Sequence, residues 1–422
     1  MSSTSGLKAY VAVTAAYWGF TLTDGALRML VLLHFNTLGY SPLQLAMLFV
    51  LYEFCGVITN LFGGWIGARL GLKVTLWSGL LIQIGALIML SLLNPAWTLL
   101  ASVAWVITAQ GLSGIAKDLT KMSAKSAIKT VVPEGRDGAL FRWVAILTGS
   151  KNALKGAGFF LGTLLLEILG FNGGLWAMAA GLAVVLTGSM LLVPPDIGKV
   201  KGKVGFTAIF AKSREINLLS AARFFLFGAR DVWFVVGLPL FLYDVAGWTF
   251  TEVGAFLALW TIGYGIVQAS APTFVKRSPD GRTAETRAAR LWVLVLAFIP
   301  AAMAVLLLEP GTGIPAQAVV LVGLGLFGVV FALNSAIHSY LILAYTEGDK
   351  VALNVGFYYM ANAGGRLIGT LLSGWVYQLG GIEACLVAAG VMVASSWLIS
   401  LLLPVTVPPG TVAPVRALAD DG

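Results

Sequence analysis

Charged side chains occur inside the apolar segments of this chain, and side chains of these types can bind an anion at membrane depth. The set comprises Asp24, Arg28, Glu53, Lys117, Lys121, Lys151, Lys155, Arg230, Asp231 and Arg366. An ionised group in hydrocarbon costs at least ~2.5–3.5 kcal/mol, so each of them needs protein or water to face. Because Lys and Arg predominate, the set predicts a polar cavity with an excess of positive charge.

The segments that carry these charges are predicted to be membrane-spanning helices. The chain has 422 residues, of which 58% are hydrophobic and 11% charged, a composition typical of polytopic helical membrane proteins. Since one crossing needs about 20 apolar residues, twelve spans are expected: Tyr10–Phe35, Pro42–Gly67, Val74–Leu93, Trp97–Ile115, Phe141–Leu169, Leu175–Val193, Ile216–Tyr243, Thr251–Val275, Leu291–Leu308, Ala316–Tyr345, Val351–Leu379 and Ala384–Leu403.

The charges are distributed among the spans with a period of three. The third, sixth, ninth and twelfth spans have no charge within their apolar cores, whereas most of the others do. We therefore expect those four spans to face lipid and the others to line the cavity.

The connecting loops predict the orientation of the chain. The net charge is +8, and Lys and Arg gather in alternate loops, while the opposite loops lack them. The positive-inside rule then places both termini in the cytoplasm, and the expected location is a bacterial inner membrane. This distribution argues against nucleic acid as the partner of the basic residues.

The sequence also contains an internal repeat. An offset of about 207 residues places Asp24 on Asp231 and Gly162-Thr163-Leu164-Leu165 on Gly369-Thr370-Leu371-Leu372. We interpret this as two six-helix bundles, residues 1–193 and 215–405, joined by a basic linker over 194–214 and followed by a tail over 406–422. In such repeats the substrate site lies near the midplane between the halves.

One loop carries a family motif. The segment Gly64-Trp65-Ile66-Gly67-Ala68-Arg69-Leu70-Gly71-Leu72-Lys73 resembles the signature G-x-L-a-D-R-x-G-R-K of the major facilitator superfamily (MFS). Gly64, Arg69, Gly71 and Lys73 match the motif, which we assign to a gating loop, while Ala68 stands where the family has Asp. The resemblance implies an all-α integral membrane protein with the MFS fold, in which twelve helices form two pseudo-symmetric bundles.

Four segments resemble a narrower group, the ArsJ-type organoarsenical efflux permeases. They are Trp18–Leu30, Ser113–Lys125, Trp143–Lys155 and Phe227–Trp233. The resemblance implies export of 1-arseno-3-phosphoglycerate, which a partner glyceraldehyde-3-phosphate dehydrogenase makes from arsenate. That enzyme is a functional partner and need not bind the chain, which we expect to be a monomer.

The candidate ligands of such an anion are cationic. Lys117 and Lys121 begin a stripe that continues at every fourth residue, on one helical face, and Lys151 and Lys155 repeat this spacing. Arginine forks bind phosphate in bidentate fashion, and the set is completed by Arg28, Arg230, Arg366 and His338. Snorkelling to the inner interface remains an alternative for Lys117 and Lys121, and a satisfied helix histidine for His338.

Three carboxylates are candidates for proton coupling or charge relay: Asp24, Glu53 and Asp231. Asp24 and Arg28, at i and i+4, could instead form only an intrahelical ion pair. Neighbours on a helix point about 100° apart, so Arg230 and Asp231 need not neutralise each other.

Other classes of function lack their motifs. No Walker A motif, G-x-S-x-G or H-E-x-x-H occurs, and Cys55 and Cys385 are far apart, so we predict no enzyme, no catalytic residue, no metal site and no cofactor. Gly158 with Gly162 and Gly365 with Gly369 predict close helix packing. An organophosphate or phosphate exchanger and a non-transporting anion sensor remain alternatives to the exporter.

Overall fold

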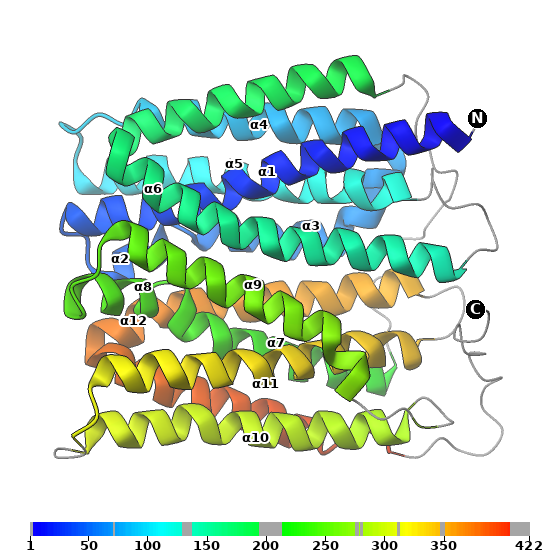
Figure 1. The fold of residues 1–422 in the computed structure, drawn as a ribbon, viewed down its shortest axis with the longest axis vertical. Coiled ribbons are helices and arrows are strands. Elements are labelled where there is room, and N and C mark those ends of the chain that lie inside the picture. Colours follow the sequence, from blue (N-terminus) through cyan, green and yellow to red (C-terminus); the bar gives the residue numbers. More distant parts are fainter. Residues whose placement is uncertain are drawn as a thin grey trace.

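The computed structural model is an all-helical bundle. It describes residues 3–70, 72–128, 137–193, 213–274, 278, 282–309, 313–346 and 351–405. The helices are α1 (Ser3–Thr37), α2 (Pro42–Met47), α3 (Val50–Leu70), α4 (Leu72–Ser91), α5 (Leu99–Ile128), α6 (Asp137–Leu192), α7 (Arg214–Phe234), α8 (Gly237–Leu240), the π-helix η2 (Phe241–Val245), α9 (Phe250–Phe274), α10 (Thr283–Leu308), α11 (Ala316–Ala344) and α12 (Val351–Ser400). They run side by side along one axis (Figure 1).

Two of these helices are long enough to cross a membrane twice. Gly170 interrupts α6 with φ 68°, and Gly381 interrupts α12 with φ 64°, a left-handed conformation that glycine adopts without strain. Among the described residues, nine helices are long and apolar enough to span a membrane, and α6 and α12 are two of them. With α1 as a further span, the described chain has the twelve spanning segments that the sequence predicts.

Several predicted boundaries were wrong. Helix α1 begins at Ser3 and not at Tyr10, and α10 begins at Thr283, eight residues before the predicted Leu291. Hydropathy locates the hydrocarbon core, whereas a helix continues into the interfacial region as long as its backbone bonds are satisfied. The predicted span that starts at Pro42 is divided into α2 and α3.

The internal repeat is visible in the turns that follow α1 and η2. Gly39 and Gly247 both have positive φ, 81° and 72°. After the first, the backbone N–H of Ser41 donates to the side chain of Gln44 at 2.8 Å. After the second, the backbone N–H of Thr249 donates to Glu252 at 2.8 Å. The same capping arrangement therefore occurs at equivalent places, as the offset predicted.

Glycines bring the first helix of each half against the fifth. A Cβ on Gly158 would lie 3.1 Å from the Cα of Gly25, so α6 and α1 are in backbone contact. A Cβ on Gly369 would lie 2.6 Å from the carbonyl oxygen of Gly228, so α12 and α7 pack in the same way. The predicted packing role of both glycine pairs is confirmed, and the buried charges beside them are held on close-packed helices.

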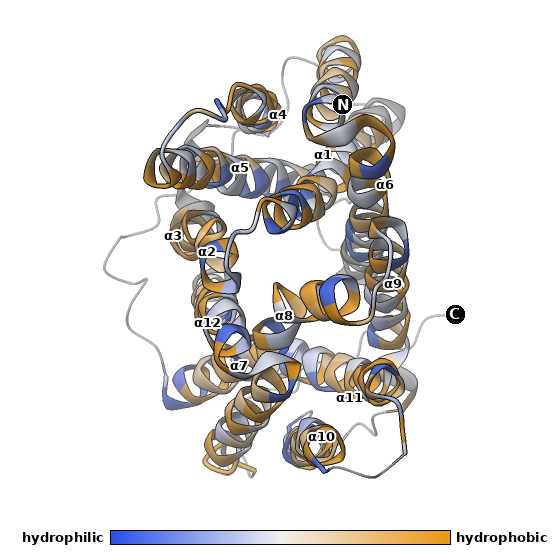
Figure 2. Ribbon diagram, turned by 90° about the vertical axis from the view of Figure 1, so that its left-hand side faces the viewer, coloured by the Kyte–Doolittle hydropathy of each residue, from blue (hydrophilic) through white to orange (hydrophobic). Residues whose placement is uncertain are grey.

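Helices α4 and α10 lie at opposite edges of the bundle (Figure 2). Their large apolar side chains face outward, as Leu81 (53% exposed) and Phe298 (66%) show. The second segments of α6 and α12 expose Val184 and Val391 in the same way. These are the four charge-free spans of the sequence, and their apolar outer surfaces suit contact with lipid.

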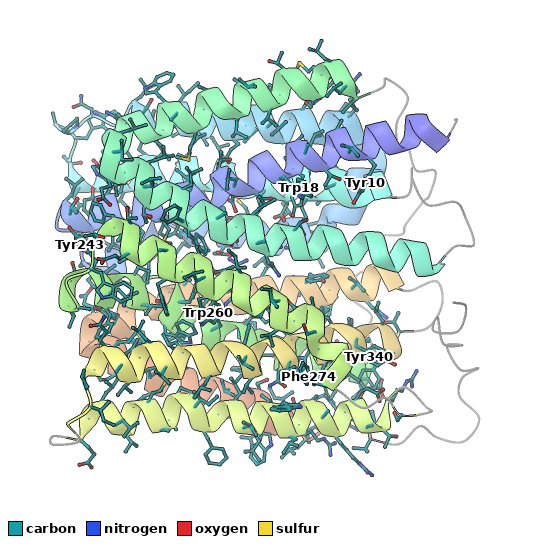
Figure 3. The ribbon with its side chains drawn as sticks, in the orientation of Figure 1. Tyr10, Trp18, Tyr243, Trp260, Phe274 and Tyr340 are labelled. Atoms are coloured by element: carbon teal, nitrogen blue, oxygen red, sulfur yellow. The ribbon has the colours of Figure 1, made fainter. Side chains whose placement is uncertain are left out.

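The two halves meet where α3 packs against α12 and α6 packs against α9. We call the end of the bundle at which α1 begins the inner end, and the end at which α1 stops and α2 begins the outer end. Figure 3 shows Tyr243 near the outer end and Phe274 and Tyr340 near the inner end.

Candidate substrate-binding site

A chain of ion pairs crosses the middle of the bundle. Glu53 Oε1 accepts hydrogen bonds from Arg28 Nη2 and Arg366 Nη2, both at 2.7 Å. Arg366 Nε also donates to Asp231 Oδ2 at 3.1 Å, and Arg230 Nε donates to Asp231 Oδ1 at 2.6 Å. Three arginines thus share two carboxylates, which are each only 1% exposed.

The positions of these residues on their helices bring them to one depth. Arg230 lies halfway along the stretch Arg214–Val245, and Glu53 lies halfway along Pro42–Phe62. Arg28 and Glu53 belong to the first half of the sequence, and Arg366 and Asp231 belong to the second. The bond between Glu53 and Arg366 is therefore a direct ionic link between the halves.

A second group adjoins this network through an aromatic ring. The hydroxyl of Tyr52 donates to Asp24 at 2.7 Å, and Lys117 Nζ lies 3.9 Å from the centroid of the same ring. A cation over an aromatic face is stabilised by about 0.5–2 kcal/mol. Tyr52 therefore connects an acid on α1 with a base on α5.

Among the five cations described at mid-depth, Lys155 has no carboxylate within ion-pair distance. Its Nζ lies 5.8 Å from the ring centroid of Phe159, and Arg28, Arg366, Asp24 and Glu53 are within electrostatic range. Within the described part of the chain, it makes no hydrogen bond or ion pair to a carboxylate. A lysine without a carboxylate partner at this depth is available to an incoming anion.

Taken together, the centre has an excess of positive charge. It contains five cationic side chains and three carboxylates: Arg28, Lys117, Lys155, Arg230 and Arg366, against Asp24, Glu53 and Asp231. The side chains of Arg366 and Arg230 are still 18% and 16% exposed. Partial exposure of charged groups in the middle of a helical bundle indicates room for solvent or solute beside them.

Further lysines lie towards the inner end. Lys121 Nζ donates to Asn60 Oδ1 at 2.8 Å and lies 3.5 Å from Asp118 Oδ1, so Asp118 partly neutralises the stripe. Lys121 and Lys117 both contact polar or aromatic groups of α3. Lys151 is half-buried on α6.

Two pairs of neighbouring charges, left open by the sequence, have different partners in the structure. Arg230 and Asp231 do form an ion pair, because the long arginine side chain folds back along α7 to reach the adjacent carboxylate. Asp24 and Arg28 form no intrahelical pair, since Asp24 binds Tyr52 and Arg28 binds Glu53 on α3. For Asp24 and Arg28, partners on α3 therefore replace the partner on the same helix.

The remaining predicted residues have different surroundings. His338 is fully buried, and within the described chain neither of its ring nitrogens has a hydrogen-bond partner among the protein groups. Gly64 and Arg69 fall within α3, Lys73 Nζ lies 4.4 Å from the ring centroid of Trp77, and Gly71 is outside the described residues. Among the described residues no three His, Cys, Asp or Glu side chains gather as metal ligands would.

Sequence reasoning missed two residues of this region. Tyr52, which binds Asp24, directly precedes Glu53 in an apolar helix. A polar hydroxyl next to a buried carboxylate is the sequence feature that could have identified it. Arg223 is buried on α7 and donates to Asn362 Oδ1 at 3.0 Å. It lies seven residues before Arg230, which places it on the same helical face.

Twelve helices in two similar halves, with an ionic centre between them, define a polytopic membrane transporter. The chain belongs to the Major Facilitator Superfamily, whose model matches residues 9–342. No curated protein sequence matches it significantly.

Solved transporters share the fold. A POT family transporter in complex with a thioalcohol conjugated peptide has a TM-score of 0.70 and 15% identity, with 93% of this chain and 95% of that chain covered. A point mutant of the nucleoside transporter NupG has a TM-score of 0.69 and 15% identity, with 94% and 98% covered. A POT family transporter in complex with 5-aminolevulinic acid has a TM-score of 0.72 and 15% identity, with 93% and 95% covered. At this identity the likeness shows the fold alone.

Proposed function

We propose that the protein exports an anionic organoarsenical, 1-arseno-3-phosphoglycerate, and so confers resistance to arsenate. The observation that carries the proposal is the excess of cations over carboxylates at mid-depth, with Lys155 lacking an acidic partner. The resemblance of four segments to ArsJ-type permeases supplies the particular substrate. A cytosolic glyceraldehyde-3-phosphate dehydrogenase would produce it, and export would proceed across a bacterial inner membrane.

The proposed substrate carries an oxyanion at each end, and the candidate ligands are distributed to match. Arg366 and Arg230 present planar forks from the second half, and such forks bind phosphate-like groups through two hydrogen bonds. Lys155 and Lys117 present ammonium groups from the first half. An anion between them would contact both halves, which is where alternating-access transporters hold their substrates.

The Glu53–Arg366 pair gives the transport cycle a physical basis. When a substrate oxyanion binds Arg366, it takes over the role of Glu53 and weakens the ionic link between the halves. The two bundles are then free to rock about the site. Three carboxylates remain candidates for carrying a proton during this exchange: Asp24, Glu53 and Asp231. Four further side chains are candidates for guiding the anion to the central site: Arg28, Lys121, Lys151 and His338.

The test is transport by everted membrane vesicles. Wild-type vesicles should accumulate 1-arseno-3-phosphoglycerate, generated from arsenate by added glyceraldehyde-3-phosphate dehydrogenase. Lys155→Ala should lower the rate at least tenfold, because a charge-assisted hydrogen bond is worth about 1.5–3 kcal/mol. The protein should stay in the membrane, since Lys155 forms no ion pair with any described residue.

The matched control is Lys8→Ala, which removes a lysine from the inner end of α1 and should transport at the wild-type rate. Transport by Lys155→Ala at the wild-type rate would remove this lysine from the site. Absence of any flux in wild-type vesicles would contradict export itself and would favour the sensor.

An organophosphate or phosphate exchanger is the second candidate, because the same arginines suit any phosphate monoester. Plain 3-phosphoglycerate, offered in excess to the same vesicles, separates the two functions. An exporter selective for the arsenate ester retains most of its flux, whereas an exchanger loses it to the competitor.

A further inference from the structure

Two layers of polar contacts join α7 to α12. In the layer at mid-depth, Asp231 of α7 accepts from Arg366 of α12 at 3.1 Å. In the second layer, Arg223 of α7 donates to Asn362 of α12 at 3.0 Å. Arg223 precedes Arg230 by seven residues and Asn362 precedes Arg366 by four, so the second layer lies towards the inner end. A rise of ~1.5 Å per residue separates Arg223 from Arg230 by ~10 Å.

The second layer lacks the carboxylate that the first contains. Arg223 is 3% exposed, and its described partners are the carbonyl oxygen of Ser335 at 3.1 Å, the Asn362 amide and two aromatic rings. The rings belong to Phe227, with its centroid at 3.9 Å, and Tyr358, at 5.0 Å. The arginines of the central cluster, Arg28, Arg230 and Arg366, all have acidic partners. Within the described residues, Arg223 has no carboxylate partner.

Two further polar groups lie beside Arg223. The hydroxyl of Tyr358 is buried, with Ser339 as a hydrogen-bonding neighbour. His338 lies one turn beyond Ser335 on α11, within electrostatic range of Arg223, and both of its ring nitrogens are buried without a hydrogen bond in the part of the chain that the structure describes. Leaving such a group unsatisfied costs about 1–3 kcal/mol. Guanidinium, imidazole and phenol can all donate, and an oxyanion would accept from each of them.

We propose that Arg223, His338 and Tyr358 form a second binding site for a small oxyanion, on the inner side of the central cluster. The ligand is a phosphate-like group, either free or as one end of a larger anion. Asn362 keeps accessible surface, so the path to the site runs past its amide. The site does not depend on the central substrate being an organoarsenical, and it would offer an anion a position about two helical turns from Arg230.

The test is equilibrium dialysis of the full-length protein in lipid nanodiscs against radiolabelled inorganic phosphate. Wild type should bind phosphate at two classes of site. Arg223→Gln should lose one class. Asn362→Asp should lose the same class, because it supplies the carboxylate that the second layer lacks while it preserves the hydrogen bond to Arg223. Tyr358→Phe, which removes only the hydroxyl, should weaken that class by about three- to tenfold.

Asn354→Asp is the matched control, because it makes the same chemical change two turns away on α12 and should leave both classes intact. Lys155→Ala should remove only the central class, so failure of the proposed export and failure of the second site are distinguishable. If 3-phosphoglycerate displaces phosphate from the second class at lower concentration than unlabelled phosphate does, the ligand is the end of a larger anion. A single class in wild type, or two classes in both Arg223→Gln and Asn362→Asp, would overturn the proposal.

Discussion

The two halves of the chain are joined by different chemistry at the outer end and at mid-depth. At the outer end Asn36 Nδ2 donates to Asp244 Oδ1 at 2.9 Å, and the backbone N–H of Thr251 donates to Glu167 at 3.2 Å. The backbone N–H of Leu43 donates to Gln378 at 3.3 Å. At mid-depth the link is the ion pair of Glu53 with Arg366.

The outer hydrogen bonds and the mid-depth ion pair therefore have different roles: the hydrogen bonds close the outer end, and the ion pair can respond to an anion. The outer hydrogen bonds of Asp244, Glu167 and Gln378 lie at the exposed surface, so water can replace each of them, and the net value of each is about 0.5–1.5 kcal/mol. Glu53 is 1% exposed, and water cannot replace it as the partner of Arg366 at comparable cost. A substrate anion can replace it, because an anion also carries the negative charge that Arg366 needs. The outer contacts therefore set how readily the closed end opens, and the buried pair makes opening depend on the ligand.

The largest expected effect comes from Glu53→Gln. This change leaves Arg28 and Arg366 without their shared carboxylate, and an unpaired buried charge destabilises by about 3–5 kcal/mol. We expect a clear fall in the midpoint of detergent-induced unfolding and loss of vesicle transport. Both are measured on the purified protein and on everted vesicles.

The double variant Glu53→Gln with Arg366→Gln removes one charge of each sign and should recover part of the lost stability, but not transport. If the single variant were as stable as wild type, the pair would not hold the halves together at mid-depth. The mid-depth pair would then contribute no more to holding the halves together than the outer hydrogen bonds do.

The sequence predicts the fold well for a physical reason. Hydrocarbon excludes unpaired backbone groups and charges, so the length of apolar runs and the places of their charges restrict the architecture. The turns at Gly39 and Gly247 and the glycine contacts of Gly158 and Gly369 follow from residue types that admit few alternatives. The lipid-facing character of α4 and α10 follows from the absence of charge in their cores.

The pairing within the site could not be predicted in this way. Arg230 reaches its own neighbour Asp231 because a flexible side chain is not confined to the direction of its Cβ. Arg28 binds Glu53 in place of Asp24 because α3 brings a more enclosed carboxylate into range. Such choices depend on the distance between helices, which a single sequence does not specify.

The outer contacts predict an intermediate effect. Asp244→Ala removes the partner of Asn36 and should shift the equilibrium towards an open outer end by about 1 kcal/mol, roughly a fivefold change in population. Spin labels at Leu38 and Val245, which are 57% and 67% exposed, report the separation of the two halves there. The fraction of long distances between the labels should increase.

Asp244→Asn is the matched control, since an amide can still accept a hydrogen bond from Asn36, and its distances should resemble those of wild type. An unchanged distribution in Asp244→Ala would show that the remaining outer contacts are sufficient for closure. The Asn36–Asp244 hydrogen bond would then not set how readily the outer end opens.

The smallest effect on the opening of the outer end should come from the two helix caps, which lie there but within one half each. The side chains of Ser41 and Thr249 accept from backbone N–H groups three residues ahead, Gln44 at 3.4 Å and Glu252 at 3.2 Å. Loss of an N-cap costs about 1 kcal/mol, so Ser41→Ala and Thr249→Ala should lower stability by similar amounts in detergent unfolding. Because neither bond crosses between the halves, the spin-label distances should not change. A lengthened distance in either variant would show that the caps help to close the outer end, and that closure is not confined to contacts such as Asn36 with Asp244.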